Sequence, residues 1–322
     1  MAPRPDPPAP PPDARLPAVF LRADALAAGI PEHRLRRAHL VRIGHGAYRN
    51  TEASPVRWKD VGLPEPSHGV DGHRLWALLR HRPDAVLSHA TAAHLHGLPT
   101  PWGPPGVPPP VDVTVPADAH RLRLPGVRAR RRPLPAQHVV LLHGLRVTSL
   151  ERTVVDLGSL PAAWTFADVV AAADHAVRHP WSPGRRRAPA TTPGLLWTVL
   201  ANLGPFHGVR TARDALGRMR VGADSAYETF LRLALEDAGL PEPVLQAQPR
   251  PVTGCPEVDL YFPTADLALQ YDGGSHLTPD QQARDARRDS WLLARGCRTV
   301  RVSRADHGQG YRRVIQVLED LL

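Results

Sequence analysis

The sequence has 322 residues, and its 40 Lys and Arg against 31 Asp and Glu give a formal net charge of +9. This length accommodates two or three domains with cores of their own, and the excess of cationic side chains favours a polyanionic partner, nucleic acid first. Two cysteines are too few for a disulfide framework, and no segment approaches the roughly 18 apolar residues of a membrane span. We therefore expect a cytoplasmic protein without a membrane partner. Lys59 is the single lysine, so a compositional bias toward Arg is the alternative source of the charge.

The first two segments are a tail and a small domain. Residues 1–17 are rich in proline, which predicts a disordered tail and not a signal peptide. Residues 18–60 read as helix, turn, helix and two-stranded wing: the first helix ends at Gly29, and Pro31 begins a second helix with Leu35 on its apolar side. In a winged helix-turn-helix the second helix enters the major groove of DNA and the wing reaches the backbone, although some such domains mediate protein contacts only. The arginines expected to contact DNA are Arg34, Arg36, Arg37, Arg42 and Arg49.

Residues 73–178 predict an α/β middle domain. A helix is expected over residues 87–98, and its three histidines do not share a face at about 100° per residue, so this helix alone is not a metal site. Val111 to Val115 alternates as a strand. The arginine-rich run over residues 121–132 is interpreted as a solvated loop in preference to a groove for nucleic acid. A capping box predicts another helix over residues 151–157.

Residues 179–193 are rich in Pro, Arg and Thr and predict a linker to a last domain over residues 194–322. In that domain we expect a core-facing helix within residues 225–239, a hairpin, a long helix closed by Gly296, a strand and a terminal helix. The whole chain is thus predicted to be an α+β multidomain protein.

The hairpin brings polar side chains together. Val258, Leu260 and Phe262 alternate with polar residues, which is the period of a half-buried strand. If Phe262 pairs with Leu267, the register places Asp259 opposite Gln270. Mg²⁺ is held by one or two carboxylates with other oxygen donors, and such an ion activates water for phosphodiester hydrolysis. The predicted metal ligands are Asp259, Gln270 and Asp272.

Three further residues complete the candidate catalytic set, each with an alternative role. Glu228 lies at the edge of its helix's apolar stripe, where it would hold a water or an outer metal position, or be an ordinary exposed helix residue. His276 follows Asp272 by four residues and is placed to move a proton or orient a phosphate. Arg288 would hold a scissile phosphate, or pair within its helix with Asp285 and Asp289.

These residues resemble the PD-(D/E)XK, or restriction-endonuclease-like, superfamily and most closely its Vsr-like branch. The resemblance covers about the last hundred residues and implies a restriction-endonuclease-like α/β domain with a Mg²⁺-dependent site. Gln270 departs from the family pattern, where most relatives carry Glu, and a neutral amide cannot replace that charge. The matching residues are Glu228, Val258-Asp259, Gln270 to Gly273 with His276, Arg287 to Asp289, and Gly296 before Arg298 to Ser303.

The first part of the chain resembles AbiEi-type antitoxins. Their winged-helix pattern is matched by Ala25 to Ile30 and by Leu40 to Tyr48, and their middle domain by "LSHATAAHLHGL" and "VTSLERTVVDL", so the match spans about residues 18–178. Together the resemblances imply a DNA-binding protein with a Mg²⁺-dependent endonuclease domain that hydrolyses DNA phosphodiester bonds. The alternative is a non-catalytic repressor or antitoxin of a type IV toxin-antitoxin system, with a degenerate nuclease fold and a cognate nucleotidyltransferase toxin as partner. RNA as the substrate stays open.

Overall fold

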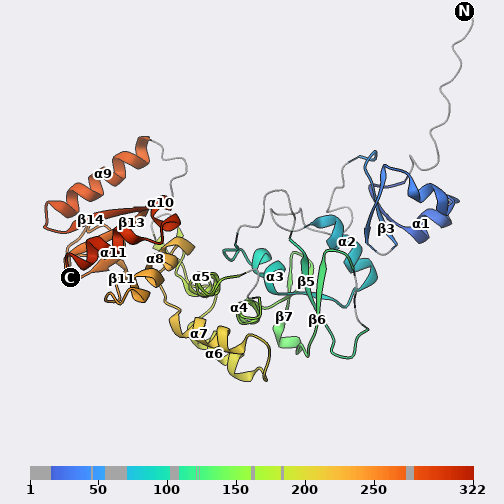
Figure 1. The fold of residues 1–322 in the computed structure, drawn as a ribbon, viewed down its shortest axis with the longest axis horizontal. Coiled ribbons are helices and arrows are strands. Elements are labelled where there is room, and N and C mark those ends of the chain that lie inside the picture. The colour runs from blue at the N-terminus through green and yellow to red at the C-terminus, as the bar shows by residue number, and fades with distance from the viewer. Residues whose placement is uncertain are drawn as a thin grey trace, which may run out of the picture. The chain divides into compact units, whose positions relative to one another are not determined.

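The chain is an α+β protein of two compact units, which confirms the expected α+β multidomain class (Figure 1). The computed structural model describes residues 16–44, 46–54, 71–101, 109–120, 122, 124–160, 164–182, 185–272 and 279–322. Unit 1 comprises Met1–Gly97 and Trp102–Ser149, and unit 2 comprises Leu98–Pro101 and Leu150–Leu322. The division after Ser149 differs from the sequence interpretation, which places residues 73–178 in one domain and a linker at 179–193.

Unit 1 begins with a three-stranded antiparallel sheet in the order β1-β3-β2. Phe20, Ala25, Ile30, Leu35 and Leu40 are buried together and form one small hydrophobic core for these elements. The elements are β1 (Val19–Leu21), α1 (Arg22–Ala27), η2 (Glu32–Arg36), β2 (Leu40–Gly44) and β3 (Ala47–Asn50).

The second helix expected after Pro31 is shorter than predicted. Only a 3-10 helix, η2, forms, and Arg37 after it has extended backbone angles. Leu35 and Leu40 are both buried. At about 100° per residue they would lie roughly 140° apart on one helix, so burying both requires the chain to leave the helix between them. Leu40 accordingly begins β2 instead of lying on the helix.

A five-stranded mixed sheet in the order β6-β5-β4-β8-β7 forms the rest of unit 1. The hairpin between β7 and β8 turns at His143 and Gly144, which both have left-handed backbone angles, as its tight two-residue turn requires. The expected helix over residues 87–98 is observed as strand β4 followed by α3. The elements are α2 (Gly72–His81), β4 (Val86–Leu87), α3 (His89–Leu95), β5 (Val111–Val115), β6 (Val127–Arg131), η4 (Ala136–His138), β7 (Val139–Leu142) and β8 (Leu145–Thr148).

The arginine-rich run interpreted as a solvated loop contains strand β6, parallel to β5. Asp112 on β5 is fully buried and therefore needs partners for its charge. Arg128 donates to both of its carboxylate oxygens at 3.0 and 2.8 Å, and Arg130 donates to Oδ1 at 2.8 Å. These arginines are two positions apart on one strand and therefore share a face. Both can thus pair with the Asp112 carboxylate, which ties β6 to β5.

Unit 2 opens with helices that pack on one another. Gly158 and Gly208 mark the closest approach: a Cβ atom at Gly208 would lie 2.2 Å from the carbonyl oxygen of Gly158. Gly208 also has φ +92°, so the contact depends on glycine at that position. The helices are α4 (Leu150–Leu157), α5 (Phe166–Val177), α6 (Pro193–Asn202), α7 (Val209–Arg218) and α8 (Ala226–Asp237).

The segment predicted as a linker at 179–193 contains a short antiparallel hairpin. β9 (Trp181–Ser182) pairs with β10 (Arg185–Arg186), and Arg186 lies opposite Trp181. Arg186 forms ion pairs with carboxylates elsewhere in unit 2, Asp224 and Glu257, which tie the hairpin to that unit. Neither acid is near Arg186 along the chain, so no local pattern indicates order in this segment.

The last sheet has the order β11-β12-β13-β14, with β13 and β14 parallel and the other pairs antiparallel. α9 covers one face through Trp291 and Leu292, and α8 and α11 cover the other (Figure 1). β11 was not predicted, whereas the hairpin and the following helix and strand are confirmed. The elements are β11 (Val244–Ala247), β12 (Val258–Phe262), β13 (Leu267–Asp272), α9 (Pro279–Leu293), β14 (Arg298–Ser303), α10 (Arg304–Gly308) and α11 (Arg312–Glu319).

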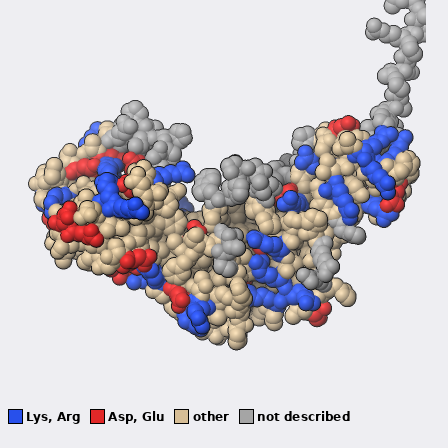
Figure 2. All heavy atoms as spheres, viewed as in Figure 1, with Lys and Arg blue, Asp and Glu red and all other residues tan. Residues whose placement is uncertain are grey.

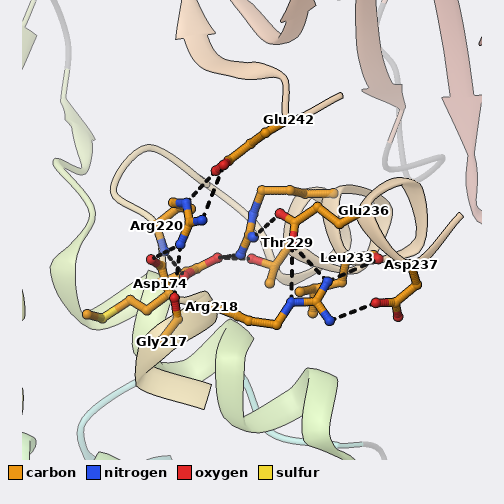
Figure 3. Close-up of polar contacts among 11 residues, drawn as sticks. Asp174, Gly217, Arg218, Arg220, Thr229, Leu233, Glu236, Asp237 and Glu242 are labelled. Atoms are coloured by element: carbon orange, nitrogen blue, oxygen red, sulfur yellow. Dashed lines mark hydrogen bonds and ion pairs between the residues drawn. The ribbon is translucent and has the colours of Figure 1, made fainter. Parts of the chain in front are cut away.

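A buried ionic junction joins α5 to α8 (Figure 3). Asp174 on α5 accepts from the Arg232 guanidinium at 2.9 Å, from the Thr229 hydroxyl at 2.9 Å and from the Arg220 backbone N–H at 2.6 Å. Arg232 also donates to Glu236 at 2.6 Å. Asp174 and Arg232 are both withdrawn from water, so each is stable there only because the other is present.

Among the residues that the structure describes, none of the helices has both the length and the apolar content to cross a bilayer.

Replacing Asp174 by Ala should destabilise unit 2 strongly. Among the described residues, the substitution leaves the buried Arg232 charge with Glu236 as its remaining ion-pair partner, and breaking a buried pair costs about 3–5 kcal/mol. Asp237→Asn is the matched control, because its ion pair with Arg218 is exposed and worth less than about 1 kcal/mol. Urea unfolding followed by circular dichroism measures both. Equal shifts in the two variants would contradict the junction's role.

Candidate functional site

The pairing of Phe262 with Leu267, expected from the sequence, is observed, and Leu260 pairs with Leu269. Continuing this register by one residue would place Asp259 opposite Gln270 across β12 and β13. Cross-strand neighbours share a face of the sheet. Asp259 is fixed there because its Oδ2 atom accepts from the Tyr271 backbone N–H at 2.7 Å.

Glu228 reaches the same region from the first turn of α8, which is capped by Ser225. Its side chain is 6% exposed, so the alternative of an exposed helix residue is wrong. Oε1 accepts from the Ser225 hydroxyl at 2.8 Å, and Oε2 accepts from the Asp224 backbone N–H at 2.9 Å and from Gln246 Nε2 at 3.1 Å. These three donors fix the orientation of the carboxylate.

The two carboxyl groups are held in an unfavourable electrostatic environment. Burial, with the Asp259 charge second, raises the pKa of Glu228 to about 8. Burial is also the main reason why the pKa of Asp259 rises to about 6, and the charges of Asp224 and Glu257 add to it while Arg288 opposes it. Titratable groups with such shifts, gathered at one place, are typical of functional sites. A cation between them would relieve both the burial penalty and the repulsion.

Gln270 adds an unsatisfied polar group to the site. Its side chain is 3% exposed, and its Nε2 atom has no hydrogen-bond partner within the described part of the chain. The oxygen and nitrogen of a side-chain amide exchange places when the group flips. With the oxygen in that place, a cation would satisfy it.

The remaining candidate residues have separate surroundings. Asp272 ends β13 opposite Ser303 of β14 and is half-buried. Arg288 pairs with Asp285 at 2.9 Å, so the intrahelical pairing is present, yet its charge also lowers the pKa of Asp259. His276 lies outside the described residues, as do Gly273 and Thr278.

The described donors suit a hard cation with few protein ligands. No group of three His, Cys, Asp or Glu side chains in the described ranges is arranged to hold a metal ion. Mg²⁺, however, commonly takes one or two carboxylates and completes its shell with water and substrate oxygens. Asp259, Glu228 and the Gln270 amide therefore fit Mg²⁺, whereas they do not form an all-protein cage.

A ring of polar residues around Glu228 was not predicted from the sequence. Asp224, Gln246, Glu257 and Arg186 each bond to Glu228 directly or through one another. Glu257 shares the alternation of Asp259 and was detectable in principle. Gln246 lies on the unpredicted strand β11, and Arg186 lies in the segment interpreted as a linker, so neither carried a local signal.

The proposed DNA-contacting arginines lie on η2, the residue after it, β2 and β3. Arg36, Arg37, Arg42 and Arg49 are exposed and Arg34 is half-buried. Arg42 Nε donates to the Gly44 carbonyl at 3.1 Å, which orients that side chain along the strand. Figure 2 shows Lys and Arg side chains across the visible face of these N-terminal elements.

Comparisons with known proteins identify no family. No protein-family model matches the chain, and no curated protein matches it. Among solved structures it is similar to the RV2827C protein from Mycobacterium tuberculosis, with a TM-score of 0.40 and 19% sequence identity, over 63% of this chain and 73% of that one.

Glu228→Gln should stabilise the protein at alkaline pH. The folded-state pKa of Glu228 is raised, so folding is favoured below the unfolded value and that advantage is lost as pH rises toward about 8. The amide keeps the shape without the charge, and at pH 8 we expect a gain of about 1–2 kcal/mol that shrinks toward pH 5. Urea unfolding at both pH values measures this. Asp237→Asn on the same helix is the control, and a gain independent of pH would contradict the raised pKa.

Proposed function

We propose that this chain binds DNA and hydrolyses its phosphodiester bonds with Mg²⁺ as cofactor. The observation that carries the proposal is that the buried carboxyl group of Glu228 and the half-buried carboxyl group of Asp259 lie close enough to interact, beside the buried Gln270 amide, whose Nε2 atom has no hydrogen-bond partner in the described part of the chain. Placing two carboxyl groups together out of water is unfavourable for folding, and such arrangements are typical of binding or catalytic sites. The resemblance to Vsr-like nucleases supports the same proposal through the same residues.

In this proposal each residue has one task. Asp259 is the principal ligand of Mg²⁺, and Gln270 and Asp272 complete or position the shell. A bound Mg²⁺ supplies positive charge at the scissile phosphate and makes water a better nucleophile. Glu228 orients the attacking water, and Arg288 offsets the charge that develops on the phosphate. His276 assists proton transfer.

The DNA-binding part of the proposal rests on the N-terminal elements. Four of the five proposed DNA-contacting arginines are exposed, and this exposure and the resemblance to the winged helix of AbiEi-type antitoxins support the binding of the DNA backbone. With η2 as a single 3-10 helix, the proposed contacts come from its surface and from the β2–β3 hairpin. The module would deliver the endonuclease-like domain to DNA.

A second candidate function is favoured by Gln270. A neutral amide at this position reduces the charge available to a metal, so the nuclease-like domain would be degenerate and the protein a non-catalytic repressor or antitoxin. Its partners would then be operator DNA and a cognate nucleotidyltransferase toxin. DNA binding is common to both candidates, whereas strand cleavage belongs to the first alone.

Asp259→Ala should abolish Mg²⁺-dependent nicking of supercoiled plasmid DNA, because it removes the main metal ligand. Conversion of supercoiled to open-circular DNA with time, with and without EDTA, measures the activity. Asp237→Asn, an exposed acid on α8, is the control and should cut normally. Unchanged cleavage by Asp259→Ala would refute the assignment, and a wild-type protein that binds DNA without cutting it would favour the repressor.

Arg34→Ala combined with Arg37→Ala should weaken DNA binding, since each arginine that neutralises a phosphate adds to affinity through counterion release. We expect the slope of log affinity against log salt to become shallower by about 0.9 for each phosphate that is no longer neutralised. Fluorescence anisotropy with a labelled duplex at several salt concentrations measures it. Arg210→Ala with Arg213→Ala on α7 removes the same charge elsewhere and is the control. Equal weakening in the two double variants would mean that net charge alone sets the affinity.

A further inference from the structure

Arg186 connects the β9–β10 hairpin to the acidic site. Its Nη1 atom donates to Asp224 Oδ1 at 2.8 Å and to the His179 carbonyl at 2.8 Å. Its Nη2 atom donates to Gln246 Oε1 at 2.8 Å and to Glu257 Oε1. The side chain is 23% exposed. Its guanidinium carbon lies 5.6 Å from the centroid of the Trp181 ring, within the range of a cation–π contact. One guanidinium thus joins four segments of unit 2.

These bonds dictate the orientation of Gln246. A guanidinium donates hydrogen bonds and accepts none, so the amide oxygen of Gln246 must face Arg186. Its Nε2 atom then faces Glu228 and donates to Oε2 at 3.1 Å. Arg186 therefore determines, through one intermediate side chain, which donor Glu228 receives.

Arg186 also neutralises acids that are not proposed as metal ligands. Asp224 and Glu257 both pair with it, and both are close enough to Asp259 to act on that carboxyl group. Without Arg186 the site would hold four carboxyl groups with Arg288 as the cation that acts on Asp259. A cation entering such a cluster would have several places to bind, not one.

We propose that Arg186 is a positioning residue of this site: it confines a divalent cation to Asp259 and Gln270 by occupying Asp224 and Glu257, and it fixes Glu228 through Gln246. This inference rests on the proposed nuclease function and adds a residue from outside the segment that resembles Vsr-like nucleases. In this proposal the positive charge of Arg186 and its hydrogen-bond geometry have different effects, which different substitutions can distinguish.

The test compares Arg186→Gln, Arg186→Lys and the neighbouring Arg185→Gln in the full-length protein. Arg185 is exposed and its substitution removes the same charge from the same strand. Mn²⁺ binding by calorimetry and plasmid nicking are measured for each, with circular dichroism to confirm folding. Arg186→Gln should bind Mn²⁺ about three- to tenfold more tightly, because two carboxylates are released, yet cut at least about tenfold more slowly. Arg185→Gln should match the wild type in both.

Arg186→Lys separates the two effects. Lysine keeps the positive charge but cannot reach the four acceptors that the planar guanidinium reaches, so Mn²⁺ affinity should stay within about twofold of the wild type while cleavage still falls. If both measurements fall together in Arg186→Gln, or if neither differs from Arg185→Gln, the inference is overturned. Because Asp259→Ala tests the nuclease function separately, a failure at Arg186 alone leaves that function standing.

Discussion

The buried pair of Asp174 and Arg232 is the constraint on which the candidate site depends. Arg232 lies one turn beyond Glu228 on α8, and its partner comes from α5, more than fifty positions earlier in the chain. A buried charge is stable only next to a partner of opposite charge. The Asp174–Arg232 pair therefore constrains the position of α8 relative to α5. That position sets where the first turn of α8, with Glu228, lies relative to the beginning of β12, with Asp259. The acidic site is therefore fixed from the helical side as firmly as from the sheet.

Electrostatic repulsion and loss of hydration make the site unfavourable for folding. Glu228 and Asp259 are buried close enough to oppose each other's ionisation, and hydrogen bonds from Ser225, Gln246 and the backbone only partly offset this. Elsewhere in unit 2, acidic side chains withdrawn from water pair with arginines, as Asp174 does with Arg232 and Asp306 with Arg313. At Glu228 and Asp259 two carboxyl groups instead lie close together, and a cation bound there would favour the ionised form of both.

Local patterns in the sequence predicted the parts of the fold that local physics determines. The alternation of Val258, Leu260 and Phe262 fixed the strand and its register, because a shift by one residue would expose the whole apolar face. β6 and the β9–β10 hairpin were missed for the opposite reason. In each, arginines pair with acids distant in sequence, Asp112 in one case and Asp224 with Glu257 in the other, and no local pattern indicates such pairs. Of the site, the hairpin residues were therefore predictable, whereas the ring around Glu228 was not.

Arg186 and Asp174 lie in the chain before the segment that resembles Vsr-like nucleases, and this position determines which fragment can fold in another protein. A fragment beginning at Ser225 would contain Glu228, Asp259 and the entire last sheet, and by sequence resemblance it looks complete. In this fragment, however, Arg232 would lack its partner Asp174, and both Asp224 and Arg186 would be missing. A transplantable module begins before α4, near Leu150, so the helices ahead of the sheet belong to its architecture and are not a detachable spacer.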